Sequence, residues 1–84
     1  VARLGKERIG AFAELALVQE AHAALAPNGS DLAQSAGLPL AGLTAWQALF
    51  ELGQLQPGQT LLVHAATGGV GHLAVQLGKW KGAK

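Results

Sequence analysis

The chain has 84 residues, of which half are hydrophobic, a formal net charge of +1 and no cysteine. This length suits one small domain or a piece of a larger one, and the charge is too small to favour nucleic acid or a membrane surface as a partner. The lack of cysteine excludes disulfides and thiolate zinc sites within these residues, and it is compatible with a reducing, cytoplasmic location. The apolar run 11–18 is interrupted by Glu14 and falls short of the roughly 20 residues that span a bilayer, and it does not form a signal peptide.

The first part of the chain is predicted to contain short β-elements followed by a short helix. Residues 1–10 are polar and indicate an exposed loop or the end of a strand, whereas 12–18 and 22–25 are apolar enough for two strands of a small β domain. The Pro-Asn-Gly sequence at 27–29 predicts a turn. Ser30 is the expected N-cap of a helix over 31–36, which Gly37 would end.

A longer helix is predicted over 40–52. Pro39 suits its first turn, where a missing N–H is tolerated, and Gly53 fits the position after its end. Large apolar side chains recur at helical spacing and predict one buried face, formed by Leu43, Trp46, Leu49 and Phe50. We interpret Trp46 and Phe50 as core residues rather than as a platform for a substrate.

The last part of the chain has the pattern of a β-strand followed by a helix. After a turn at 56–58, residues 60–65 are mostly apolar, as expected for a strand buried on both faces of a sheet. An amphipathic helix is predicted from Gly69 to the glycine at 82, and a second parallel strand is predicted to begin near Lys84. The expected core-facing side chains of this helix are Val70, Leu73, Ala74 and Leu77.

A glycine-rich loop lies between this strand and this helix. We call it the glycine loop; it reads Ala66-Thr67-Gly68-Gly69-Val70-Gly71 and matches G-x-G-x-x-G with Ala in the first place. In a dinucleotide site, Gly68 would let the backbone approach a pyrophosphate, Gly71 would let helix and strand pack closely, and the helix N-terminus would bind the anion. A structural glycine turn without a ligand is the alternative, because the confirming residue of the motif would come after Lys84.

Other sites are not favoured by the spacing of the polar residues. His72 follows Gly71 where a P-loop needs Lys, and it also stands where a short-chain reductase loop needs glycine. The three histidines, His22, His64 and His72, lack a metal-ligand pattern, so no metal is expected. The lysines at 79, 81 and 84 suit the negative end of a helix rather than a nucleic-acid surface.

The motifs of residues 38–84 resemble those of the medium-chain dehydrogenase/reductase superfamily, within it the zinc-independent quinone oxidoreductase (zeta-crystallin-like) branch. The matching stretches are 38–49, 57–59, 64–71 and 74–77 with Lys79. Thr67 departs from the smaller residue that is usual at its position. More loosely, 10–15 and 25–27 resemble the closing strands of the family's GroES-like domain.

The resemblance implies an α/β fold in two parts. Residues 1–37 would be the C-terminal part of a GroES-like β domain, and 38–84 would be the start of a Rossmann-type doubly wound parallel sheet. The chain would then be a fragment of an NADPH-dependent oxidoreductase, with NADH possible as cofactor. The parent protein would pass hydride to a quinone, an enone or a similar carbonyl-conjugated acceptor, and we expect it to be a homo-oligomer.

The resemblance also implies roles for individual residues, although no catalytic residue is assigned. Thr44 would approach the nicotinamide or a nearby phosphate, Val70 would pack on the nicotinamide, and the backbone at 67–70 would hold the pyrophosphate. Ala66 and Gly71 complete the expected cofactor-binding set. The alternatives are a non-catalytic remnant or interaction module that keeps a partial nucleotide loop, and a marginally folded piece without function.

Overall fold

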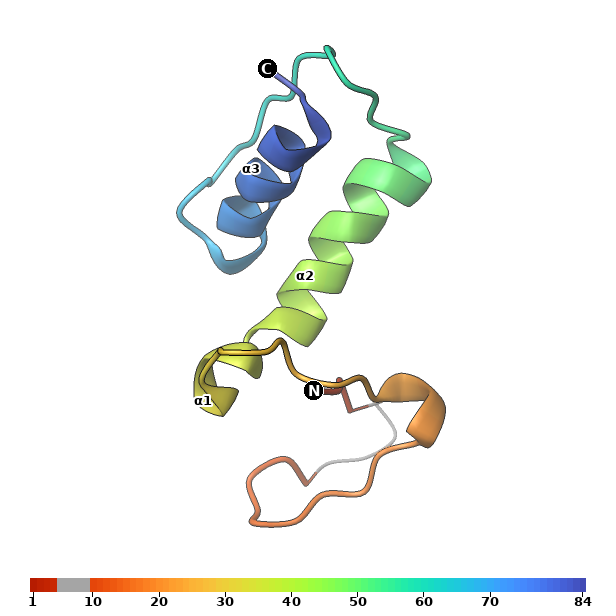
Figure 1. The fold of residues 1–84 in the computed structure, drawn as a ribbon, viewed down its shortest axis with the longest axis vertical. Helices are drawn as coiled ribbons and strands as arrows, with labels where there is room; N and C mark the ends of the chain where they lie inside the picture. The colour runs from red at the N-terminus through yellow and green to blue at the C-terminus, as the bar shows by residue number, and fades with distance from the viewer. Residues whose placement is uncertain (5–9) are drawn as a thin grey trace. The chain divides into compact units, whose positions relative to one another are not determined.

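The computed structural model describes residues 1–4 and 10–84 and divides them into two compact units, Val1–Pro39 and Leu40–Lys84 (Figure 1). Residues 5–9, part of the predicted N-terminal loop, lie outside the described residues. Within the described residues the regular elements are helical: η1 (Glu20–His22), α1 (Leu32–Ser35), α2 (Leu38–Trp46), η2 (Gln47–Leu52) and α3 (Gly69–Lys81). The sheet expected from the sequence therefore stays a prediction.

The two strands predicted in the first unit do not form. Residues 12–18 are exposed, and no neighbouring strand among the described residues offers them hydrogen bonds, which a strand needs. Residues 20–22 form the 3₁₀ turn η1, so that His22, the first residue of the second predicted strand, is helical instead. Beyond it, Ala2 and Ala23 form one antiparallel bridge, beside which the Ala24 amide donates to the Val1 carbonyl at 2.9 Å.

The short helix α1 forms, but its cap is not the predicted one. Asp31 is the N-cap residue, one position later than expected. The Ser30 hydroxyl instead donates to the Pro27 carbonyl at 2.8 Å and lies 2.6 Å from the Ser35 hydroxyl. Ser35 is only 1% exposed, so this pair satisfies a buried polar group. Ser30 therefore closes the turn before α1 rather than capping the helix.

The predicted helix over 40–52 is confirmed as α2 followed without a break by the π-helical η2. Pro39 lies in the first turn of α2, as expected. The Gly53 amide donates to the Ala48 carbonyl at 2.9 Å, five residues back, which is the wider spacing of a π-turn. Gly53 keeps a right-handed conformation, and the left-handed residue at the helix end is Gln54, with φ 48°.

The buried face of α2 differs in part from the predicted one. Ala45 is fully buried, whereas Leu43 and Trp46 are 52% and 41% exposed. The face that packs on α3 is built from small residues: a Cβ at Gly42 would lie 3.9 Å from Leu73 Cδ1, and one at Gly69 would lie 3.9 Å from Ala41 Cβ. Further along, the predicted face is confirmed in part: Leu49 and Phe50 are partly buried, and Trp46 packs against Phe50 and against Trp80 of α3.

The predicted helix beginning at Gly69 is confirmed as α3, which ends at Gly82 in a left-handed conformation with φ 88°. Ala41 lies beside Gly69 near one end of α2, and Trp46 lies beside Trp80 further along. The helices therefore run in the same direction, side by side (Figure 1). The most buried residues of α3 are Ala74 and Gly78, while the side chain of Val70 is 40% exposed.

Residues 60–65 return alongside α3, but they are not buried on both faces as predicted. Leu61 and Val63 are partly buried, whereas Leu62 between them is 78% exposed. This alternation is that of an extended segment with one covered side. The covering element is α3, because a Cβ at Gly78 would lie 2.5 Å from Leu61 Cδ2.

The chain meets this segment again after α3. The Lys84 amide donates to the Gln59 carbonyl at 2.9 Å, and the Leu61 amide donates to the Lys84 carbonyl at 2.8 Å. Lys84 thus lies opposite Thr60 and bonds to the residues on either side of it. This is the hydrogen-bond pattern of parallel strands. A further bond from the Gly58 amide to the Gly82 carbonyl, at 2.8 Å, lies next to it.

Candidate functional site

The glycine loop begins with an abrupt change in backbone direction. Ala65 has φ 52°, a left-handed conformation that costs a non-glycine residue roughly 1 kcal/mol. This conformation lets the Ala65 carbonyl accept a 2.9 Å hydrogen bond from the Gly68 amide, which closes a tight turn directly before α3. The turn brings the start of α3 back against the end of the extended segment.

Gly71 is the most tightly packed position of the loop. A Cβ added there would lie 2.2 Å from the Ala65 carbonyl oxygen and 3.0 Å from Ala66 Cα, closer than non-bonded atoms approach. Any side chain would therefore push α3 away from the preceding segment. The sequence predicts this close packing for Gly71. The role of the glycine loop in binding a cofactor stays a prediction.

The N-terminus of α3 offers backbone amides to an anion. Gly68 is the N-cap residue, and no side chain caps the helix. The first amide bonded back into the helix is that of His72, which donates to the Gly68 carbonyl at 3.0 Å. The preceding amides, of Gly69, Val70 and Gly71, belong to the first turn, which has no partners within a helix and lies at the positive end of its dipole.

The remaining predicted residues lie around this turn. Ala66 and Thr67 are exposed, as is Thr44 on α2. Thr44 follows Ala41, the residue beside Gly69, by about one helical turn, but its hydroxyl donates to the Leu40 carbonyl at 2.7 Å within its own helix. The structure thus places the start of α2 beside the loop, with the Thr44 hydroxyl already bonded.

One residue at the loop was missed as a candidate in the sequence. The Nδ1 atom of His72 lies 2.9 Å from the Gly68 carbonyl oxygen, so the imidazole folds back over the first turn of α3. The spacing of four residues between Gly68 and His72 is the available signal, since side chains reach the preceding turn at that distance.

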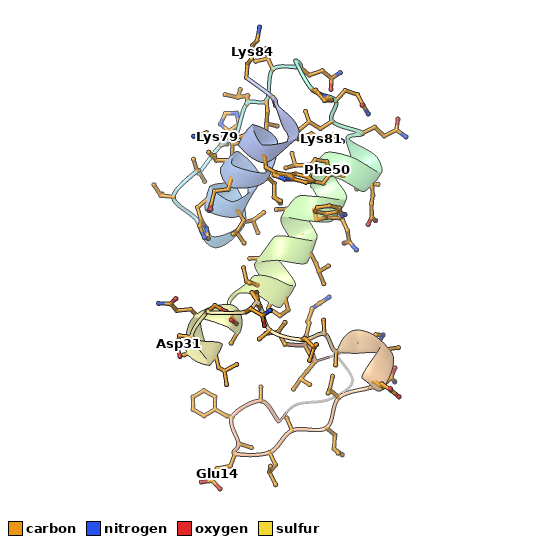
Figure 2. The ribbon with its side chains drawn as sticks, viewed as in Figure 1. Glu14, Asp31, Phe50, Lys79, Lys81 and Lys84 are labelled. Atoms are coloured by element: carbon orange, nitrogen blue, oxygen red, sulfur yellow. The ribbon has the colours of Figure 1, made fainter. Side chains whose placement is uncertain are left out.

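A second group of side chains joins α2, η2 and α3. The ring of Trp46 lies 4.6 Å from that of Phe50 and 6.2 Å from that of Trp80. Lys81 Nζ lies 5.9 Å from the centre of the Phe50 ring (Figure 2). A rise of about 1.5 Å per residue puts Trp80 roughly 16 Å from Gly69 along α3. This aromatic cluster therefore packs the helices together away from the glycine loop.

The described residues include no group of three or more histidine, cysteine, aspartate or glutamate side chains that could hold a metal ion. In that same part of the chain, every helix is too short or too polar to cross a membrane.

Comparison with known proteins finds relatives over most of the chain. It is 45% identical over 75 residues to the polyketide synthase GfsB of Streptomyces halstedii, covering 89% of this chain and 1% of that protein. It is 43% identical over 72 residues to the synaptic vesicle membrane protein VAT-1 homolog of Danio rerio, covering 86% and 15%. It is 50% identical over 66 residues to the highly reducing polyketide synthase apmlA of Arthrinium phaeospermum, covering 79% and 3%.

The chain is therefore related to short segments of much longer proteins. The names of several of them describe reducing polyketide synthases. This supports a general relation to oxidoreductases. The chain spans at most 15% of the length of these three relatives. No family model matches the chain. No solved structure matches it either.

Proposed function

We propose that this chain is the nucleotide-loop region of a medium-chain reductase of the zinc-independent quinone oxidoreductase type. In this proposal 38–84 form the first strand–helix step of a Rossmann-type sheet, and 1–37 form the end of a GroES-like domain. The observation that carries it is the glycine loop itself: Gly71 leaves no room for a side chain against Ala65, and the amides that follow Gly68 begin an uncapped helix.

The hydrogen bonds around Lys84 support the expected sheet. A Rossmann fold needs the chain to return after the helix and lie parallel to the first strand. Lys84 bonds to both Gln59 and Leu61 in the parallel pattern. A sheet extended from that point would place the glycine loop at the carboxyl end of its strands, where dinucleotides bind in this class of fold.

The residues present fit the diphosphate of NADPH, with NADH as the other possibility. The amides of Gly69, Val70 and Gly71 would donate to the phosphate oxygens, with the helix dipole adding favourable charge. The Gly68 amide, already bonded to Ala65, would keep the turn in shape rather than bind the ligand. Val70 is 40% exposed, so its side chain is available to pack against the nicotinamide ring.

When bound, the nicotinamide supplies a hydride for a quinone, an enone or a similar carbonyl-conjugated acceptor. The contribution of this chain is to bind and orient, which accounts for much of the protein's part in cofactor-dependent hydride transfer. No proton donor is assigned among its residues. Thr44 lies on α2, the helix that packs beside Gly69, and is proposed to lie near the cofactor. To bind it, the Thr44 hydroxyl would give up its hydrogen bond to the Leu40 carbonyl and bond to the ligand instead.

The experiment is a fluorescence titration of NADPH into the full-length protein, followed by turnover with a quinone and an enone. Two variants sharpen it. Val70→Asp adds a carboxylate to the first turn of α3, where it favours the helix but repels a diphosphate. Val75→Asp adds the same charge at another exposed position of α3, further along from the loop.

We expect the wild type and Val75→Asp to bind NADPH alike, and Val70→Asp to bind at least about tenfold more weakly, which is about 1.4 kcal/mol. The melting temperature of Val70→Asp should be unchanged or higher. A wild type that binds neither NADPH nor NADH would contradict the proposal. Binding without turnover of either acceptor would favour the non-catalytic module instead.

A further inference from the structure

The Gly68 carbonyl is held twice by one residue. It accepts a hydrogen bond from the His72 main-chain amide at 3.0 Å, and Nδ1 of the same residue lies 2.9 Å away. A carbonyl oxygen only accepts, so Nδ1 must carry the hydrogen of the imidazole. At neutral charge, Nε2 is then the unprotonated nitrogen of the ring.

Holding this carbonyl also fixes the amide beside it. The Gly68 C=O and the Gly69 N–H belong to one planar, trans peptide unit, in which oxygen and hydrogen point in opposite directions. Because His72 holds the oxygen toward the body of α3, the Gly69 N–H is directed away from the helix. That is the direction from which an anion would approach the N-terminus of α3.

The contact between His72 and Gly68 restrains a segment that is otherwise flexible and uncapped. Gly68 and Gly69 are adjacent glycines, whose backbone has more conformational freedom than that of any other residue pair. No side chain caps α3 from the N-cap position. The imidazole of His72 therefore restrains the N-cap carbonyl from within the helix, and it leaves to a ligand the first-turn amides that a capping side chain would bind.

We propose that His72 is a positioning residue for the diphosphate, acting through the Gly68–Gly69 peptide. This rests on the proposed function, since it assigns a role at the same loop. The imidazole does not touch the ligand; it keeps the Gly69 amide in the orientation that binding needs, and so lowers the cost of ordering the loop.

The test compares NADPH affinity of the full-length wild type with two variants of this residue. His72→Leu removes the donor, and His72→Asn keeps a side-chain N–H near the place of Nδ1. His64→Leu is the matched control, because His64 is an exposed histidine at the start of the turn that precedes α3. We expect about three- to tenfold weaker binding for His72→Leu, about wild-type binding for His64→Leu, and substantial recovery for His72→Asn.

A second measurement needs no variant. The ¹⁵N spectrum of the His72 ring in the wild type should show Nδ1 protonated and Nε2 unprotonated at neutral charge. The opposite tautomer, or equal NADPH affinity of wild type and His72→Leu, would overturn the role of His72 while leaving the proposed function standing. A wild type that does not bind NADPH or NADH would overturn both.

Discussion

The amide of Lys84 donates a 2.9 Å hydrogen bond to the carbonyl of Gln59, across the whole length of α3 in the sequence. The return bond from Leu61 to the Lys84 carbonyl, at 2.8 Å, makes this a parallel pairing rather than a chance contact. It ties the end of the chain to the start of the extended segment and fixes how α3 lies over that segment.

Replacing Lys84 by proline should break this pairing. Lys84→Pro removes the donor to Gln59, which we expect to lower the free energy of unfolding by about 1–3 kcal/mol and to expose the Leu61 amide to exchange. Lys84→Ala keeps both main-chain bonds and should stay within about 0.5 kcal/mol of the wild type. Denaturant unfolding and hydrogen exchange measure both effects. Equal stability of the two variants would show that the pairing does not form.

A methyl group at Gly71 should separate α3 from the loop. In Gly71→Ala the new Cβ would lie 2.2 Å from the Ala65 carbonyl oxygen, a backbone atom that cannot move aside. We expect a loss of about 1–3 kcal/mol or more in stability.

Gly42→Ala is the control for that variant, since its Cβ would make an ordinary 3.9 Å contact with Leu73. Gly42 lies within α2, so alanine should add up to about 1 kcal/mol of stability. Thermal melts of the two variants should therefore shift in opposite directions. If Gly71→Ala melts at or above the wild-type temperature, the packing described for the loop is wrong.

Gly78 and Leu61 should behave as a coupled pair. Alanine at Gly78 would meet Leu61 Cδ2 at 2.5 Å, which offsets the gain of about 1 kcal/mol that alanine brings to a helix. Leu61→Ala alone leaves a gap, which the methyl of Gly78→Ala fills in part in the double variant. We expect the destabilisation of the double variant to fall at least about 0.5 kcal/mol short of the sum of the singles. Strict additivity would contradict the contact.

An engineered disulfide should join α2 to the start of α3. The Cβ of Ala41 and an ideal Cβ at Gly69 lie 3.9 Å apart, within the range of about 3.5–4.5 Å seen in disulfides. The 84 residues contain no other cysteine to compete. Ala41→Cys with Gly69→Cys should therefore cross-link under mild oxidation, as read from peptide masses. If the protein is folded but only peptides with reduced cysteines are found, the two helices are not adjacent at these residues.

The sequence predicted best what local patterns decide. The start of α3 at Gly69, its end at Gly82 and the first turn of α2 at Pro39 all depend on glycine, proline and helical spacing within a few residues. The close packing at Gly71 is of the same kind, because the motif itself requires a small residue where helix and preceding segment meet.

The predictions that were wrong depended on partners elsewhere in the chain. Leu43 was predicted to lie on the core face of α2 but is 52% exposed, whereas the small Ala45 is fully buried. Trp46, on the same predicted face, does pack on α3, against Trp80. Burial of Leu62 required a neighbour on the second side of the segment, which the described residues do not supply. Spacing along the chain carries no information on which element will lie opposite.

Of the predicted cofactor site, the structure bears only on the local geometry of the loop. The glycine loop was identified by its motif, and its amides lie at the helix N-terminus as such a motif requires. The hydrogen bond between His72 and Gly68 was not foreseen, because a histidine in a first helical turn has several available rotamers. The roles of Thr44 and Val70 toward a cofactor stay predictions.

The most direct test of the central claim is to map main-chain amides of the ¹⁵N-labelled full-length protein as NADPH is added. If the glycine loop binds the diphosphate, the largest saturable shifts among these residues should fall on Gly69, Val70 and Gly71, with the Gly68 amide remaining protected by its bond to Ala65. Saturable NADPH binding that leaves these three amides unshifted would contradict the account.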